Sequence, residues 1–262
     1  MNNCRLYIVE GLPCSGKSSA SKFIAGISNG LLFDEGSGNH PADYEFSAFI
    51  PDSATEFTPE EREKLNSLSQ KQDKGIVVEL NKLDGALFDK AFRYKIYDCL
   101  DWENERRVML DKWRSFVQNA DKDSIYVFNC VLLQNPMCET MLRFNFDKEL
   151  SFEYIRQICK IIKPLNPTVV YLENNEISRS IKGALAERGE EWLNAVVDYH
   201  CNGNYGKAHG LSGFEGYISA LEERQRRELE FLPQLPVRSV VLTDPQQNWE
   251  ETYRKIRNLR TR

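Results

Sequence analysis

The residues best suited to chemistry lie near the amino terminus, in segment 11–18, which reads Gly-Leu-Pro-Cys-Ser-Gly-Lys-Ser. This segment fits the phosphate-binding pattern G-x-x-x-x-G-K-[ST] at every position. Its two glycines let the backbone curl so that successive N–H groups point at phosphate oxygens. In this pattern Lys17 bridges the β- and γ-phosphates, and the Ser18 hydroxyl is a ligand of Mg²⁺. The segment therefore predicts a nucleoside triphosphate site, with ATP and Mg²⁺ as expected cofactors.

The elements on both sides of the loop are the ones that the pattern needs. Residues 5–9 are a short apolar run with β-branched and aromatic side chains, which predicts a buried strand. Residues 19–25 favour a helix, whose N-terminus adds partial positive charge beside a phosphate. The alternative is a chance glycine turn, and the order strand, loop, helix argues against it. The expected nucleotide-binding residues are Gly11, Leu12, Pro13, Cys14, Ser15, Gly16, Lys17, Ser18 and Ser19.

Two acidic residues follow the second predicted strand. Residues 31–33 form that strand, and it stops at Asp34 and Glu35, before a glycine-containing loop with His40 and Asp43. In a parallel α/β sheet, ligands bind beyond the carboxyl ends of the strands, so this loop should begin at the same edge as the phosphate loop. We expect one of the two carboxylates to orient an acceptor hydroxyl. Asp34 is the preferred candidate, because it comes first after the apolar run. The alternative is a carboxylate that caps the loop by accepting backbone N–H groups.

Further polar candidates follow the later strands. His40 and Asp43 are expected substrate contacts, and so are Asn129 and Gln134, which follow the strand predicted at 125–128. Three cations come after the strand predicted at 168–172, and at least one is expected to stabilise the transferring phosphoryl group. The alternative for these cations is a solvated helix face. They are Arg179, Lys182 and Arg188.

Composition bounds the class of protein. The chain has 262 residues, 28% of them charged and 41% hydrophobic, which is typical of a soluble globular protein. Its net charge is −5 and it has no long basic run, so we expect no nucleic-acid partner. The seven cysteines form no C-x-x-C pair, which fits a reducing compartment. No signal peptide or membrane-length apolar run is apparent, so we expect a cytoplasmic protein with a small-molecule acceptor and no membrane partner, and leave a homodimer open.

The pattern along the chain predicts an α/β fold. Five strand candidates alternate with helices and give a three-layer fold around a mostly parallel five-stranded sheet. The core is expected at 1–43 and 124–262, with Asp244 capping a terminal helix. Residues 44–123 break the strand–helix alternation and read as a mainly helical insert, with one strand at 75–80. We expect this insert to be a lid or cap over the acceptor site.

Taken together, these motifs resemble the P-loop nucleotide and nucleoside kinases, in particular thymidylate kinases and deoxynucleoside kinases. The likeness covers residues 9–18, including Glu10, then 172–174 with the three cations, and then 241–256. It implies a P-loop kinase fold that uses ATP and Mg²⁺, with the cations on a lid helix and the last loop beside the adenine. The insert is not covered. Where those kinases carry an Asp-Arg or Glu-Arg pair after the third core strand, this chain has Asn129 and Cys130.

Two functions remain from different classes. The first is an ATP-dependent phosphotransferase that moves the γ-phosphoryl group to a hydroxyl or phosphate of a small molecule. The second is a nucleotide-hydrolysing regulatory switch, against which stands the lack of a strand ending in paired carboxylates. An acceptor pocket closed by the insert would exclude water and prevent wasteful hydrolysis, which favours the kinase. A nucleoside, a sugar and an antibiotic hydroxyl all remain candidate acceptors.

Overall fold

The computed structural model describes residues 4–259, and the chain divides into two compact units. Unit 1 contains the chain up to Glu35 and from Val117 onward, and unit 2 contains Gly36–Phe116. Each unit has a sheet of its own. None of the helices in the described range is long and apolar enough to cross a lipid bilayer.

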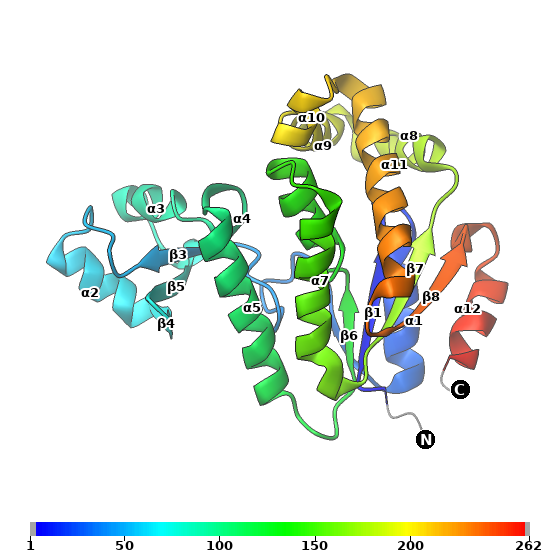
Figure 1. The fold of residues 1–262 in the computed structure, drawn as a ribbon, viewed down its shortest axis with the longest axis horizontal. Helices are drawn as coiled ribbons and strands as arrows, with labels where there is room; N and C mark the ends of the chain where they lie inside the picture. Colours follow the sequence, from blue (N-terminus) through cyan, green and yellow to red (C-terminus); the bar gives the residue numbers. More distant parts are fainter. Residues whose placement is uncertain (1–3, 260–262) are drawn as a thin grey trace. The chain divides into compact units, whose positions relative to one another are not determined.

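Unit 1 is built on a parallel five-stranded sheet, in the order β2-β6-β1-β7-β8 (Figure 1). The first strand is therefore central, which fits the apolar run at its start and the burial of all its residues. The strands are β1 (Leu6–Gly11), β2 (Leu31–Phe33), β6 (Tyr126–Asn129), β7 (Thr168–Glu173) and β8 (Arg238–Thr243). This arrangement confirms the predicted α/β class with a mostly parallel sheet.

Helices cover both faces of this sheet. An apolar cluster joins one face to α1 and α12, and α7 and α11 lie across the other face (Figure 1). A second cluster joins α8, α9 and α11 to the phosphate loop through Leu12. The helices of unit 1 are α1 (Lys17–Ser28), α6 (Gln134–Met137), α7 (Lys148–Ile162), α8 (Ile177–Arg188), α9 (Glu190–Cys201), α10 (Asn204–Ala208), α11 (Gly213–Phe231) and α12 (Trp249–Asn258). A π-helical turn, Cys138–Arg143, follows α6.

The expected cap of the last helix is wrong. Asp244 has left-handed backbone angles and leads into a 3₁₀ turn at Pro245–Gln247, and α12 begins after it. The side chain of Asn248 caps α12 by accepting from the N–H of Glu251 at 3.0 Å. The carboxylate of Asp244 instead accepts from the backbone and side-chain nitrogens of Asn175. A contact between two loops therefore takes the place of the local cap.

Unit 2 has its own apolar core around a small antiparallel sheet of order β3-β5-β4, where the sequence had predicted a single strand at 75–80. Its strands are β3 (Ser47–Pro51), β4 (Ser69–Gln72) and β5 (Gly75–Glu79). Its helices are α2 (Pro59–Leu68), α3 (Gly85–Phe92), the short turn α4 (Ile96–Cys99) and α5 (Trp102–Asn119), the last of which runs on into unit 1. At the α2 N-terminus, Thr58 and Glu61 form a capping box.

The unit boundary differs from the predicted 44–123 for a local reason. The carboxylate of Glu45 accepts from the N–H groups of Gly36 and Gly38, at 2.6 and 2.8 Å. The loop after Glu35 is therefore fastened to unit 2. At the other end, the N–H of Asp121 donates to the Tyr126 hydroxyl at 2.9 Å, which holds the end of the insert to the core strand. The role of this unit as a lid stays a prediction.

Candidate active site

The phosphate loop connects β1 to α1, as its sequence predicts. Gly11 and Gly16 have φ angles of 144° and 95°, which residues other than glycine rarely adopt. A Cβ atom at Gly16 would lie 2.7 Å from the ring of Trp249 on α12, so the space is as restrictive as the backbone angle. The two glycines thus fix the shape of the loop and the close packing of α12 against it.

Lys17 is folded back over the loop that carries it. Its ammonium donates to the carbonyl oxygens of Gly11 and Leu12, at 3.0 Å each. Beside it, the hydroxyl of Ser15 is buried and has no hydrogen-bond partner among residues 4–259. A buried donor without a partner is costly, and a phosphate oxygen would satisfy it. Both side chains therefore suit a bound phosphate.

Asn129 joins the phosphate loop to the second strand. The parallel register sets Phe33 opposite Phe128, so the next residues, Asp34 and Asn129, are also neighbours. The Nδ2 atom of Asn129 donates to Oδ1 of Asp34 at 3.0 Å and to the Ser18 hydroxyl at 3.2 Å. One amide thus holds together the predicted Mg²⁺ ligand and a predicted catalytic carboxylate.

The oxygen atoms around Asn129 fit a magnesium ion. The side chain of Asn129 is buried, with 5% of the residue exposed, and its Oδ1 atom has no partner within the described range. Mg²⁺ prefers oxygen ligands and is commonly held by one or two carboxylates together with substrate phosphates. Ser18 supplies a hydroxyl oxygen, Asp34 a carboxylate and Asn129 an amide oxygen. No group of three or more His, Cys, Asp or Glu side chains in residues 4–259 is placed to hold a metal by itself.

The second carboxylate has a separate amide partner. Nε2 of Gln134 donates to Oε1 of Glu35 at 2.6 Å. Glu35 is exposed and Asp34 is half-buried. The two amides predicted to contact a substrate therefore each hold one of the two candidate carboxylates, and their contact with a substrate stays a prediction.

A strained turn after β6 positions Gln134. Cys130 and Val131 have φ angles of 66° and 91°, which is rare for any side chain and rarer for a β-branched one. The next three N–H groups, of residues 132–134, then all donate to the carboxylate of Glu10, at 2.7, 2.9 and 3.3 Å. Glu10 is the residue just before the first glycine of the phosphate loop. These three hydrogen bonds offset the strain of the turn, and they hold the turn against the phosphate loop.

Glu10 is a fully buried acid, and its environment changes its acidity. Burial raises its pKa to about 7, with a smaller contribution from the nearby charge of Glu228. The N–H groups of Leu133 and Leu132 act in the opposite direction, as does the ammonium of Lys17. Desolvation outweighs these contacts.

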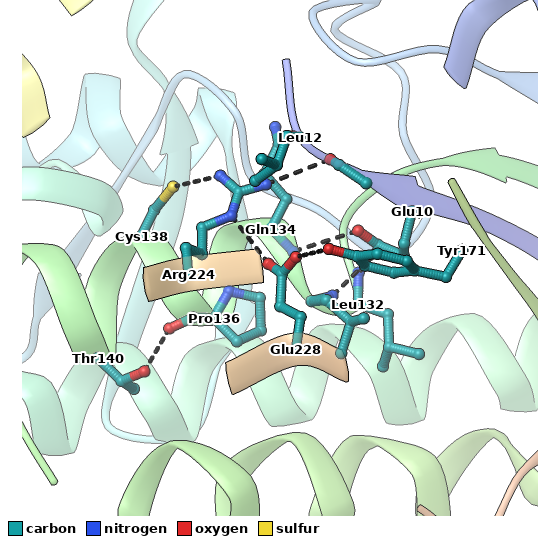
Figure 2. Close-up of polar contacts among 12 residues, drawn as sticks. Glu10, Leu12, Leu132, Gln134, Pro136, Cys138, Thr140, Tyr171, Arg224 and Glu228 are labelled. Carbon is teal, nitrogen blue, oxygen red and sulfur yellow. Dashed lines mark hydrogen bonds and ion pairs between the residues drawn. The ribbon is translucent and has the colours of Figure 1, made fainter. Parts of the chain in front are cut away.

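A buried ion pair lies behind the same loop and was not predicted (Figure 2). Arg224 and Glu228, on α11, pair at 2.8 Å between Nε and Oε1, and the Tyr171 hydroxyl donates to the other carboxylate oxygen at 2.6 Å. Nη2 of Arg224 also donates to the carbonyl of Gly11 at 3.2 Å. The sequence gives a weak signal for this pair, because many Arg and Glu residues stand four apart on exposed helix faces.

The three candidate cations all lie on the exposed side of α8. The guanidinium of Arg188 stacks over Trp192, 5.2 Å from the ring centre, and the ammonium of Lys182 lies 5.4 Å from the ring centre of Phe214. Burial raises the pKa of the Cys14 thiol in the phosphate loop, and the charge of Arg188 opposes this effect. Arg188 is thus near enough to the phosphate loop for its charge to lower the pKa of Cys14, against the effect of burial.

His40 and Asp43 lie in unit 2 and make contacts within it. Nδ1 of His40 accepts from the N–H of Ala42 at 3.2 Å, and Asp43 accepts from the N–H of Tyr44 at 2.8 Å and from the Tyr97 hydroxyl. Burial, helped by the charge of Lys112, lowers the pKa of His40 to about 3, so His40 is neutral at pH 7. Their role toward a substrate stays a prediction.

Comparison with known proteins finds likeness at the level of fold. No protein-family model and no curated protein sequence matches the chain. Among solved structures, it is similar to the YorR protein from Bacillus subtilis in complex with phosphorylated GDP, at 13% identity over 97% of this chain and 94% of that one, with a TM-score of 0.45. It is also similar to deoxyadenosine kinase from M. mycoides with bound dATP, at 13% identity over 98% of this chain and 100% of that one, with a TM-score of 0.44.

The assignment of the phosphate loop rests on this chain's own geometry. The phosphate loop leaves the central strand of a parallel sheet and enters α1, as the motif requires. The carboxyl ends of β2 and β6 bring a carboxylate and an amide to the same edge. The chain thus has a parallel α/β fold with its phosphate loop in the place that the P-loop motif requires.

Proposed function

We propose that this protein is an ATP-dependent phosphotransferase that moves the γ-phosphoryl group to a hydroxyl or phosphate of a small molecule. The observation that carries the proposal is the amide of Asn129, which bonds both Ser18 of the phosphate loop and Asp34 after β2. It puts a carboxylate beside the place where the terminal phosphates are expected. Phosphoryl transfer needs little more than positioning and charge stabilisation at that place.

Each polar group has a role in this proposal. Lys17 turns from its carbonyl partners to the β- and γ-phosphates, and the Ser15 hydroxyl donates to a phosphate oxygen. Ser18, Asp34 and the free oxygen of Asn129 would hold Mg²⁺. When bound, the ion neutralises charge on the terminal phosphates.

The two carboxylates take different tasks. The sequence placed Asp34 first as the group that orients the acceptor. Its bond to Asn129 supports a task on the metal side instead, because that amide also holds Ser18. Glu35 is exposed and fixed by Gln134, so we assign it to the acceptor, which it would orient and deprotonate. Positioning is its main contribution, since the loose transition state needs little base strength.

The remaining assignments follow the same proposal. Arg188 is the cation proposed to stabilise the transferring group, because its charge is felt at Cys14. We also propose a cytoplasmic location, which the seven free cysteines support, since reduced thiols persist there.

An acceptor screen tests the function. The full chain is incubated with ATP, Mg²⁺ and a library of nucleosides, nucleotides, sugars and hydroxylated antibiotics, and products are read as a mass gain of one phosphoryl group. Lys17→Ala is the control and should give no product while keeping its fold. ATP consumption without a phosphorylated acceptor, across the whole library, would contradict a kinase and favour hydrolysis.

A further inference from the structure

The ion pair between Arg224 and Glu228 needs a reason for being buried. The two side chains are 1% and 0% exposed. Removing two charges from water is costly, and an apolar pair of similar volume often serves stability as well or better. Glu228 also accepts a hydrogen bond from the Tyr171 hydroxyl, so both of its carboxylate oxygens have a partner (Figure 2). Such a fixed geometry suggests that the guanidinium is held for a contact beyond the pair.

That contact is with the phosphate loop. Nη2 of Arg224 donates to the carbonyl of Gly11 at 3.2 Å, and the same carbonyl accepts from the ammonium of Lys17 at 3.0 Å. Nη1 points at the sulfur of Cys138, 3.9 Å away. The three nitrogens of one planar fork thus reach three groups on separate segments. A lysine, as a point charge, could not do this.

The shared carbonyl gives Arg224 its task. Lys17 must leave the carbonyls of Gly11 and Leu12 when it binds phosphates. Gly11 is buried, and a buried carbonyl without a donor is costly. Arg224 supplies a donor to Gly11 whether or not Lys17 is there.

We infer that Arg224 is a positioning residue for nucleotide binding: it holds the Gly11 carbonyl so that Lys17 is free to bind the triphosphate. Glu228 and Tyr171 orient its guanidinium. Arg224 touches no phosphate itself and acts through the backbone of the loop. The inference rests on the proposed function only in requiring that the loop binds a triphosphate.

The test removes the whole cluster without leaving a buried charge. The triple variant Arg224→Met, Glu228→Leu, Tyr171→Phe replaces each polar group by an apolar one of similar size. The matched control is Arg226→Met with Glu230→Leu, on the same helix at the same spacing, where the side chains are 56% and 36% exposed. A second variant, Arg224→Lys, keeps a cation beside Glu228 but lacks the fork.

Binding of ATP and of inorganic triphosphate is measured by calorimetry with no acceptor present, and unfolding midpoints are measured without nucleotide. We expect the triple variant to raise both dissociation constants about tenfold, the effect of one lost hydrogen bond to a buried acceptor. Arg224→Lys should also raise both dissociation constants, and the exposed control should leave both dissociation constants unchanged. An equal loss for the two ligands places the effect at the phosphates, and unfolding midpoints well above the titration temperature show that the loss does not come from unfolded protein.

The outcomes separate the two proposals. If Arg224→Lys or the triple variant binds both ligands as tightly as the wild-type protein, the positioning role is wrong and the proposed function stands. If the exposed control loses as much affinity as the triple variant, the positioning role is also wrong. If the wild-type protein binds neither ligand, both proposals fall.

Discussion

Asn129 stands where the kinases that the sequence resembles carry a charged residue, and its neutral amide makes different contacts. It cannot supply negative charge, but it can donate to two oxygens at once, and it does so to Ser18 and Asp34. In the proposed function, Asp34 after β2 takes the place of the carboxylate that is missing after β6, and the amide holds it there. The site keeps an acid beside the phosphate loop although the acid comes from another strand.

The division of tasks between the two acids is testable at single residues. Glu35→Gln should lower acceptor phosphorylation by about a hundredfold, as expected when an orienting base is removed. It should leave the affinity for Mg²⁺-ATP unchanged, measured by calorimetry. Asp34→Asn should instead weaken the binding of Mg²⁺-ATP more than it weakens the binding of metal-free ATP, measured with a chelator present. If Asp34→Asn affects the two forms of ATP equally, the acid does not serve the metal.

Glu10 makes stability depend on pH in an unusual direction. The pKa of Glu10 rises from 4.5 to about 7 in the folded protein, so between these values the folded state holds a proton that the unfolded chain has lost. The contribution of Glu10 to the free energy of unfolding is therefore largest below pH 4.5 and falls as the pH rises toward 7. The total change is on the order of 3 kcal/mol.

Glu10→Gln should remove this slope. Denaturant unfolding of both proteins at pH 5 and pH 7.5 measures it, and the difference between the two proteins cancels the titration of all other groups. The wild-type protein should lose more stability than the variant between the two values. Parallel curves for the two proteins would show that Glu10 is ionised in the fold throughout this range.

Among the elements, the phosphate loop is held from two sides. Trp249 of α12 packs against Gly16, and Arg224 of α11 bonds the carbonyl of Gly11. The loop's shape is thus fixed by helices that come more than 200 residues later in the chain.

Gly16→Ala tests this packing. A Cβ atom at this position would lie 2.7 Å from Trp249, on a backbone with φ of 95°, so the loop must move. We expect loss of measurable ATP binding by calorimetry and a lower unfolding midpoint. Gly26→Ala is the matched control on α1, because its Cβ would meet nothing within 4 Å. That variant should be more stable by about 0.5–1 kcal/mol and bind ATP normally.

The whole molecule consists of two units with separate cores. The core of unit 2 is built on β3 and β5, with α2 and α3 against them. All residues of the phosphate loop, with Asp34, Glu35 and Asn129, belong to unit 1. Nucleotide binding and the packing of unit 2 should therefore be separable by mutation.

Ile50→Ala measures this separation. Ile50 is fully buried in the core of unit 2, so its truncation should cost about 2–5 kcal/mol of the stability of that unit. The affinity for ATP, measured at a temperature where the variant is folded, should not change. A weaker affinity would mean that the nucleotide site draws on unit 2.

The sequence alone determined the phosphate loop and its two neighbours, because strand, loop and helix are contiguous and the glycine and lysine positions follow from local backbone chemistry. It also determined the parallel α/β class, since buried apolar runs alternate with helices. The tertiary structure decided what faces the loop. Asp34 and Asn129 are 95 residues apart and meet only because β2 and β6 are adjacent in one register. Arg224 and Arg226 each have a glutamate four residues later, and only packing buries one pair and exposes the other.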